Sequence, residues 1–304
     1  MAISRHQLVK ELEPGLNALF GLEYKRYDNQ HAEIYTSESS DRAFEEEVML
    51  SGFGNASVKS EGSGVAFDNA QESYSARYTH ETVALAFAIT EEAIEDNLYD
   101  RISSRYTKAL ARSMSNTKQV KAAAPLNNGL PSVDGFDSGD GVSLFNTSHS
   151  TVSGTSVKNT LTTQADLNET SLEQAMIDIS GMTDERGLRI AAKAVKMIVP
   201  SANQFAAERL MKSQGRTGTA DNDINALGSM GMIPQGYRVN NFLTDTDSFY
   251  IITDVPNGMK MFTRAPLTTA MEGDFDTGNV RYKARERYSF GVSDFRGIFG
   301  VEGA

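Results

Sequence analysis

The sequence contains no cysteine, which excludes disulfides, thiolate zinc sites and a cysteine nucleophile. It also lacks any apolar run as long as a membrane-spanning helix requires. The first fifteen residues do not contain the apolar core of a signal peptide. We therefore expect a protein without membrane contact that is made and used in a cytoplasm.

Positive charge is scarce in this chain. It has 29 Lys and Arg residues against 40 Asp and Glu residues, so the formal net charge is −11. Domains that recognise a specific DNA sequence are usually basic, and the balance argues against that class of protein. Net charge affects solubility and self-repulsion more than fold, so an acidic protein can still lie next to nucleic acid.

Histidine is also scarce, and no two of the four histidines have the spacing of metal ligands: His6, His31, His80 and His149. His80 and Glu81 begin like a zinc-protease motif, but the second histidine is missing. A phosphate-binding loop and a GxSxG nucleophile elbow are absent too. The sequence predicts no catalytic residue, no metal site and no cofactor.

One long helix is predicted from about Thr90 to about Ala124. Apolar residues recur every fourth position and so share one face: Ile94, Leu98, Ile102, Tyr106, Leu110 and Met114, continued by Val120 and Ala124 after a slip at Thr117. Thr90 can cap the start, and Pro125 is expected to stop the helix. At 1.5 Å per residue the helix would be roughly 50 Å long, which suits a stiff beam.

The residues before this helix suggest an arm and a hairpin. Residues 1–46 are predicted to be an arm, with a short amphipathic helix from Arg5 to Leu22 that is interrupted near Pro14 and Gly15. The arm ends in an acidic run: Glu45, Glu46 and Glu47. Glycines then punctuate residues 47–80, which predicts a long hairpin with a glycine-rich tip. Because its arms carry few apolar side chains and isolated two-stranded ribbons are marginal, the hairpin needs external support.

The second half of the chain suggests a compact unit followed by a long strand. Residues 141–263 are predicted to form an α+β unit, with a helix from about Asn168 and a buried strand at Ala194–Val199. From Val280 to Val292 apolar residues alternate with polar ones, which predicts a strand with one buried face and Glu286 as that face's only charge. The other face carries a basic stripe: Arg281, Lys283, Arg285 and Arg287.

Three segments resemble the major capsid protein of tailed bacteriophages, which has the Hong Kong 97 fold. They are Ala88–Asp96 at the entry to the long helix, Gly141–His149 with the pattern G-x-x-L-F-x-T-x-H of the Mu-type major head subunit branch, and Phe275–Lys283 in the final strand. The resemblance implies an α+β fold with an N-terminal arm, an extended hairpin loop, a peripheral domain with a long spine helix, and an inserted axial domain. The implied limits are 1–46 for the arm, 47–80 for the loop, 81–140 and 264–304 for the peripheral domain, and 141–263 for the axial domain.

The family implies a non-enzymatic structural role. Subunits would form hexamers and pentamers of an icosahedral shell around double-stranded DNA, assembled in the host bacterial cytoplasm. Further implied partners are a portal, possible scaffolding or decoration proteins, and packaged DNA in non-specific contact. The family's founding member joins subunits through a lysine–asparagine bond; Lys59 lies near the hairpin tip here, but without a matching motif we expect an ordinary surface lysine.

The basic stripe, the acidic run and Lys59 are the predicted inter-subunit contacts, with the stripe of one subunit against Glu45, Glu46 and Glu47 of the next. Pairing within the subunit, for instance with Glu95 of the long helix, and direct DNA contact are the alternatives. For the whole protein, two alternatives also stay open. One is an encapsulin-like compartment shell of the same fold, and the other is a stand-alone hydrolase or binding protein.

Overall fold

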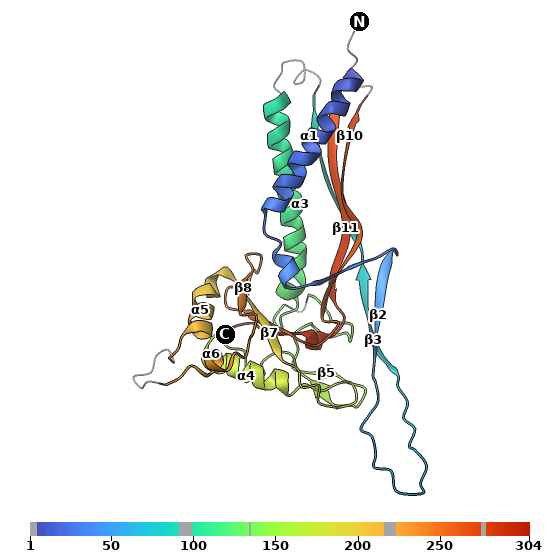
Figure 1. Cartoon of the computed structure of the whole chain (residues 1–304), viewed down its shortest axis with the longest axis vertical. Helices are drawn as coiled ribbons and strands as arrows, with labels where there is room; N and C mark the ends of the chain where they lie inside the picture. The colour runs from blue at the N-terminus through green and yellow to red at the C-terminus, as the bar shows by residue number, and fades with distance from the viewer. Residues whose placement is uncertain (1–4, 91–98, 134, 216–222, 275–277) are drawn as a thin grey trace.

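An elongated layer of two helices on a twisted sheet makes up one half of the molecule (Figure 1). The computed structural model describes residues 5–90, 99–133, 135–215, 223–274 and 278–304. The sheet has the order β1-β10-β11-β4. Its strands are β1 (Thr36–Ser39), β10 (Met259–Gly273), β11 (Val280–Val292) and β4 (Glu81–Ile89). β1 runs parallel to β10, and the other neighbours are antiparallel.

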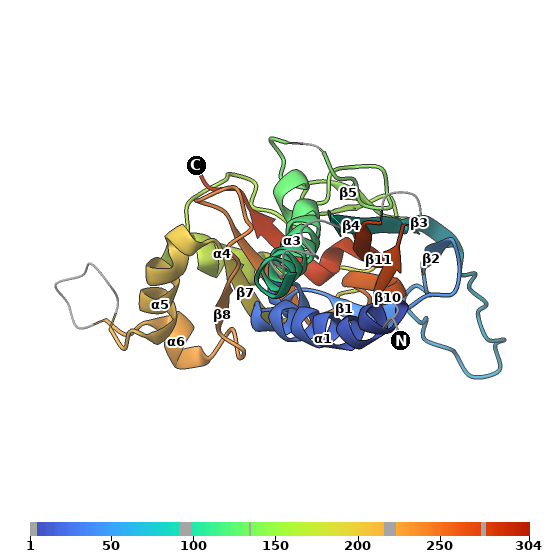
Figure 2. The same ribbon diagram turned by 90° about the horizontal axis from the view of Figure 1, so that it is seen from above.

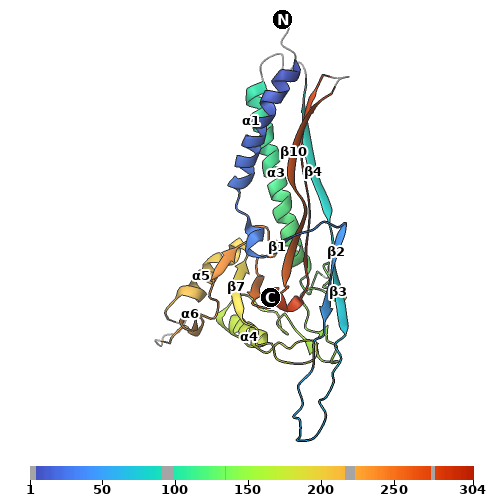
Figure 3. The same ribbon diagram turned by 45° about the vertical axis from the view of Figure 1, so that its right-hand side comes forward.

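The helices α1 (Arg5–Arg26) and α3 (Tyr99–Asn128) lie side by side against one face of this sheet (Figures 1 and 3). The apolar side chains between them come from three elements: Leu16 and Phe20 of α1, Leu110, Ala111 and Met114 of α3, and Tyr282 and Ala284 of β11. Alternation along β11 aims its buried residues at the helices, as the sequence predicts. The predicted strand over Val280–Val292 is confirmed at both ends.

The N-terminal helix differs from the prediction. It runs without a break through Pro14 and continues to Arg26, so the expected interruption near Pro14 and Gly15 is wrong. The segment is also less of a free arm than predicted, because Leu16 and Phe20 are buried against α3 and β11. Tertiary burial of this face outweighs the local disadvantage of one proline.

The spine helix α3 also differs at its end. Pro125 does not stop it: the helix continues to Asn128 with Pro125 inside the last turn. That turn is held from outside, since the Tyr250 hydroxyl donates to the Leu126 carbonyl at 3.2 Å and Leu126 is wholly buried. The helix was predicted to start at about Thr90. Residues 91–98 lie outside the described residues, and α3 is described from Tyr99.

The described side chains of the predicted apolar row on α3 are only partly buried, and its members Ile94 and Leu98 lie outside the described residues. Leu110 and Met114 are buried, but Tyr106 is 54 % exposed and Val120 is 50 % exposed. A four-residue spacing turns about 40° around a helix at each step, so Tyr106 is turned away from the centre of the buried face, and Val120, six residues after Met114, falls outside that spacing. Buried positions on α3 therefore include small and polar side chains that the apolar pattern missed: Ser103, Thr107, Ser115 and Gln119.

A second four-stranded sheet lies at one end of the elongated layer, in the order β12-β9-β7-β8. Its strands are β12 (Ile298–Val301), β9 (Phe249–Thr253), β7 (Ala194–Val199) and β8 (Tyr237–Val239). Around it lie α4 (Glu169–Ser180), α5 (Gln204–Lys212), α6 (Ala226–Met230) and the short pair β5 (His149–Ser150) and β6 (Ser156–Val157). The predicted strand at Ala194–Val199 is confirmed, as is a helix at Asn168, which caps α4.

The chain end belongs to this second sheet. Residues 264–304 were assigned together to the peripheral domain, but β12 pairs with β9 and not with the long strands. Ile298, Phe299 and Val301 are buried in the core of the compact unit. Gly300 lies so close to Phe145 that an added Cβ would come within 2.6 Å of the ring. Close packing of this short apolar segment therefore places it in the compact unit.

The hairpin consists of β2 (Phe44–Leu50) and β3 (Glu72–Thr79), and its long loop extends beyond the compact unit (Figure 1). Seen from above, hairpin and compact unit project on opposite sides of the elongated layer (Figure 2). Among the described helices, none combines the length and apolar character needed to cross a bilayer.

Candidate functional site

The hairpin is packed at its base and exposed at its tip. At the base, the ring of Tyr78 meets Phe262 edge-on at 4.8 Å, and its hydroxyl lies 2.5 Å from the Ser293 hydroxyl oxygen. An added Cβ on Gly291 would come within 2.6 Å of the same ring, so only glycine lets the hairpin approach β11 this closely. The base of the hairpin is therefore a fixed part of the subunit.

The loop of the hairpin exposes apolar side chains. Val58 is 97 % exposed and Phe67 is 98 % exposed, and Phe53 and Val65 are mainly exposed as well. Lys59 lies beside them on the exposed loop. Burying such side chains is favourable by roughly 1.5–3 kcal/mol each, so the loop offers apolar surface that a partner could bury.

The acidic run lies on β2 and not in a free arm, which corrects its assignment to the last residues of the arm. Lys260 donates to Glu47 at 2.5 Å, and the Ser293 hydroxyl also donates to Glu47. The Ser40 hydroxyl donates to Glu45 at 2.7 Å. These carboxylates therefore help to fasten the hairpin to its own subunit.

Glu46 is the most exposed member of the acidic run. It lies 3.7 Å from Arg77 on the paired strand, and about half of each side chain is exposed. Exposed pairs of this kind contribute little to stability, so Glu46 is free to exchange partners.

The basic stripe lies on the face of β11 that is turned away from α3. Arg281, Lys283 and Arg285 are exposed, and Arg281 pairs with Asp274. Across the sheet their neighbours on β4 are small, namely Ala88, Ala86 and Ala84 in register. On the other side, β10 places Glu272 opposite Arg281, so this face is basic mainly at Lys283 and Arg285. The described part of α3 packs on the opposite face of the sheet.

Arg287, the last member of the stripe, is placed differently. It is half-buried, and its Nε is a buried donor that finds no hydrogen-bond acceptor among the described residues. Burial and, after it, the charge of Arg287 lower the pKa of nearby His80. Arg287 therefore lies inside the junction between hairpin and sheet, apart from its three exposed neighbours. Glu95, an alternative partner for the stripe, lies outside the described residues.

Two buried ionic groups tie the parts of the subunit together. Glu286, the predicted charge on the inner face of β11, accepts from Lys118 of α3 at 3.3 Å and from the Tyr24 hydroxyl of α1 at 3.4 Å. Burial raises the pKa of Glu286, and Lys118 opposes that rise. One inner carboxylate thus connects both helices to the sheet.

The second buried ionic group is centred on Arg296, and no pattern in the sequence predicted it. Arg296 donates to Glu185 at 2.7 Å and to the Thr183 carbonyl at 2.8 Å, and it pairs with Asp294 at 3.2 Å. Glu185 also accepts from Ser73 of β3 at 3.0 Å. Except for the local pair with Asp294, these contacts join segments more than 100 residues apart, so no local pattern could have revealed them.

His149 lies in a closed structural network. Its Nδ1 is 2.6 Å from Asp140 and its Nε2 is 3.0 Å from Asn159, and the ring stacks on Phe295 at 3.8 Å. Both ring nitrogens are thus occupied by protein groups. Within the described residues, no cluster of three or more His, Asp or Glu residues could hold a metal ion.

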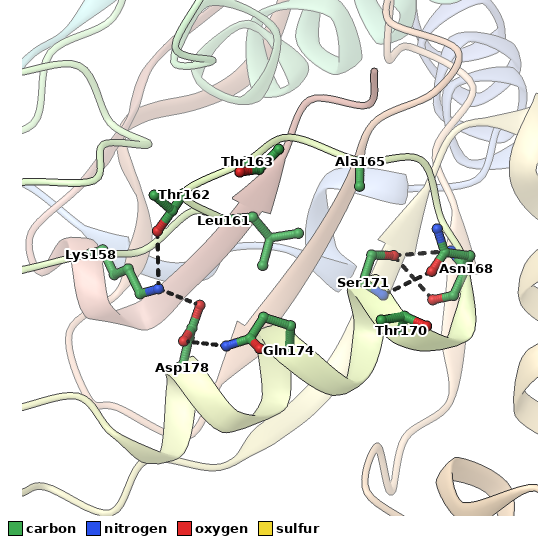
Figure 4. Close-up of a pocket in the computed structure, with 10 residues that line it drawn as sticks. All are labelled: Lys158, Leu161, Thr162, Thr163, Ala165, Asn168, Thr170, Ser171, Gln174 and Asp178. Carbon is green, nitrogen blue, oxygen red and sulfur yellow. Dashed lines mark hydrogen bonds and ion pairs between the residues drawn. The ribbon is translucent and has the colours of Figure 1, made fainter.

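An open pocket of about 390 Å³ lies between α4 and the preceding loop (Figure 4). Its polar side chains bond mainly to one another. Lys158 pairs with Asp178 at 2.8 Å, and Gln174 donates to the same carboxylate at 2.9 Å. Asn168 and Ser171 form the capping box that begins α4. The pocket therefore contains structural bonds and not a nucleophile beside a base.

Comparison with known proteins gives one family and a set of shared folds. The model of a family described as phage capsid protein matches residues 73–301. A search of curated proteins returned no match. The capsid of Myoviridae phage XM1 is 12 % identical with a TM-score of 0.53, and the alignment covers 89 % of each chain.

Two further solved structures have the same fold. A virus-like particle from Pyrococcus furiosus is 10 % identical with a TM-score of 0.55, covering 95 % of this chain and 98 % of that one. The capsid of an empty GTA particle is 16 % identical with a TM-score of 0.52, covering 90 % and 89 %. At sequence identities of 10–16 %, the similarity to these three structures shows a shared fold alone.

Proposed function

The chain belongs to the phage capsid protein family and is a structural major capsid protein with a Hong Kong 97-like fold, and from this premise we propose that it builds the head of a tailed bacteriophage. Subunits would associate as hexamers and pentamers of an icosahedral shell around double-stranded DNA. A portal, and scaffolding or decoration proteins where they are used, would complete the particle. Assembly would take place in the host bacterial cytoplasm.

The exposed hairpin loop carries this proposal. Val58 and Phe67 are almost wholly exposed in the single subunit. The base of the same hairpin is firmly packed on β11, so the loop is held in a fixed direction instead of folding back. A neighbouring subunit that covers the loop would bury these side chains. Repetition of one such contact around a closed shell adds many weak interactions.

We propose that the basic stripe receives an acidic segment of the adjacent subunit. The exposed members Arg281, Lys283 and Arg285 would lie against the acidic run on β2, with Glu46 as its most available carboxylate. Glu45 and Glu47 already have partners in their own subunit and would contribute mainly through the field of their charge. Arg287 would act from within the hairpin junction, and Lys59 would lie near the contact at the loop.

The proposed domains follow the two halves of the fold. The peripheral domain contains the elongated layer, and the axial domain contains the compact sheet and its helices. We propose that α1 and β1 be grouped with the peripheral domain, since they pack on α3 and β10. Residues 298–301 would be grouped with the axial domain, because β12 completes its sheet.

We propose that the chain has no enzymatic activity. The polar side chains of the pocket beside α4 and both nitrogens of His149 are engaged in structural bonds. Proton transfer and nucleophilic attack require groups that are free to reach a substrate.

Electron microscopy of the purified full-length protein tests the proposed function. Uniform hollow particles or rings of five and six subunits would support it, and a strict monomer at all concentrations would contradict it. The contents of the particles distinguish a phage head from a protein compartment. The likeness to the virus-like particle raises the possibility of an encapsulin-like compartment. Protein cargo in particles isolated from the producing cell would favour that compartment, whereas DNA inside would favour a phage head.

A further inference from the structure

The exposed side of α3 carries three cations for which the described part of the chain offers no partner. Arg105, Lys108 and Arg112 are all exposed. Among the side chains that the structure describes, none forms an ion pair or hydrogen bond with any of the three. We call these three residues the spine-helix cations.

The spine-helix cations form a straight line. They follow the spacing i, i+3 and i+7, which places them on one face over about 10.5 Å of helix axis. The exposed side chains beside them are short and uncharged: Ala109, Ser113 and Asn116. Tyr106, an exposed aromatic next to Arg105 in the chain, contacts the ring of Phe87 on β4 and is therefore turned toward the sheet. A long, flat or convex anion can approach all three cations at once.

After Asp100 in its first turn, α3 carries charge of only one sign. From Arg101 to Asn128 the chain contains six Lys and Arg residues and no Asp or Glu, although the whole protein has 40 acidic residues. Two of the six are used inside the subunit, because Lys118 pairs with Glu286 and Lys121 with Glu81. Like charges three and four residues apart weaken a helix. The unpaired cations therefore do not stabilise the subunit and require another explanation.

We propose that the spine-helix cations bind the phosphates of packaged nucleic acid without regard to base sequence. The inference rests on the proposed function and adds the residues and the face that DNA would contact. A protein partner fits this surface poorly, since buried interface centres are rich in aromatic and other large apolar side chains and none stands between these cations. Phosphate binding requires only accessible positive charge.

The opposite face of the same layer fits a different partner. Lys283 and Arg285 point away from α3, because they alternate with Tyr282 and Ala284, which pack against it. That face already contains acids, since Arg281 pairs with Asp274 and lies opposite Glu272. The two basic surfaces cannot face the same compartment across one thin layer. The unneutralised helix side therefore faces the nucleic acid, and the sheet side faces a neighbouring subunit.

The test compares two variants of the full-length protein, each with three cations removed. The first is Arg105→Gln, Lys108→Gln and Arg112→Gln, which keeps good helix formers. The control is Arg281→Gln, Lys283→Gln and Arg285→Gln, with the same change of charge on the opposite face. Binding of a labelled mixed-sequence DNA duplex is measured by fluorescence anisotropy across a series of low salt concentrations. Thermal melting and electron microscopy of both variants record folding and assembly separately.

We expect wild-type protein to bind DNA, with an affinity that falls steeply with salt. In the helix variant the slope of log affinity against log salt should become shallower by about 2 to 3, since each lost phosphate contact contributes roughly 0.9. The sheet variant should keep most of the wild-type slope.

Any of four results would overturn the inference. The first three are no DNA binding by the wild type, an unchanged salt slope in the helix variant, and an equal loss of slope in both variants. The fourth is tighter binding of polyglutamate, a probe for an acidic protein partner, than of DNA at the spine-helix cations. Failure to form particles would count against the proposed function instead, because DNA binding by the subunit is measured without assembly.

Discussion

Arg296 and Glu185 form an ion pair inside the protein, with 2.7 Å between Nη2 and Oε1 and only 2 % of either side chain exposed. The pair connects the entry to β12 with the loop after α4. Through Ser73, it also holds the loop end of the hairpin strand β3. The direction of an exposed hairpin thus depends on a buried charge pair in the compact unit.

Arg296→Met should destabilise the subunit by about 3–5 kcal/mol, because it leaves Glu185 buried without its partner. Chemical denaturation of the purified subunit measures this loss. Arg186→Met is the matched control, since its pair with Asp68 is exposed and should contribute little. Equal stabilities of the two variants would show that the Arg296–Glu185 ion pair does not hold these segments together.

Leu110→Ala should reduce the free energy of unfolding by roughly 2–5 kcal/mol, as large core truncations do. Leu110 is 4 % exposed and packs in the cluster between α1, α3 and β11. Ser113→Ala, on the exposed side of the same helix, should change stability little. Similar losses in both variants would mean that the helix face has been assigned wrongly.

Deletion of Ser57–Gly64 should leave the melting temperature near that of the wild type and prevent shells from closing. The deleted residues belong to the exposed loop, while the packed base of the hairpin remains. Scanning calorimetry and electron microscopy measure the two effects. A subunit that unfolds after this deletion would place the loop in the intramolecular core.

Arg285→Glu should impair assembly and make it more sensitive to salt, because it reverses one charge in the centre of the exposed stripe. Subunit melting should stay near wild type. Adding Glu46→Lys should partly restore assembly, which light scattering can follow. If the double variant assembles no better than the single one, pairing between these two surfaces is refuted.

Stability should fall between pH 7 and pH 5 because of His31. Burial, and after it the charge of Lys118, lower the pKa of His31 from 6.5 to about 4. An unfolded chain takes up a proton below about pH 6.5 while the folded chain does not, so acid favours unfolding in this window, by about 1–2 kcal/mol at pH 5. Denaturation at several pH values checks the slope. His31→Gln should flatten it, and an unchanged slope would exclude His31 as the cause.

The sequence predicted an element correctly where a repeat or a cap among neighbouring residues was enough to specify it. Alternation over Val280–Val292 predicts β11, since a strand with one buried face must repeat every second residue. Asn168 predicts the start of α4, because its side chain caps the first turn. The hairpin follows from weakly apolar strands on either side of a glycine-rich loop.

Predictions from neighbouring residues were wrong where contacts with residues distant in the chain outweigh a local preference. Pro14 was expected to interrupt a helix and Pro125 to end one, yet both lie inside helices that are packed against other elements. Gly300 and its neighbours form too short an apolar run to show which sheet they join. Contact with Phe145 decides that they complete the compact sheet.

The sequence by itself determined the order of elements, the alternating faces of β11 and the family resemblance, because these depend on neighbours along the chain. The tertiary structure alone decided the partners of the charges. Glu47 binds Lys260, Glu185 binds Arg296, and the spine-helix cations bind nothing within the described subunit. Charge pairing acts through space over a few ångströms, so only the folded chain shows which charges are neutralised and which remain for another molecule.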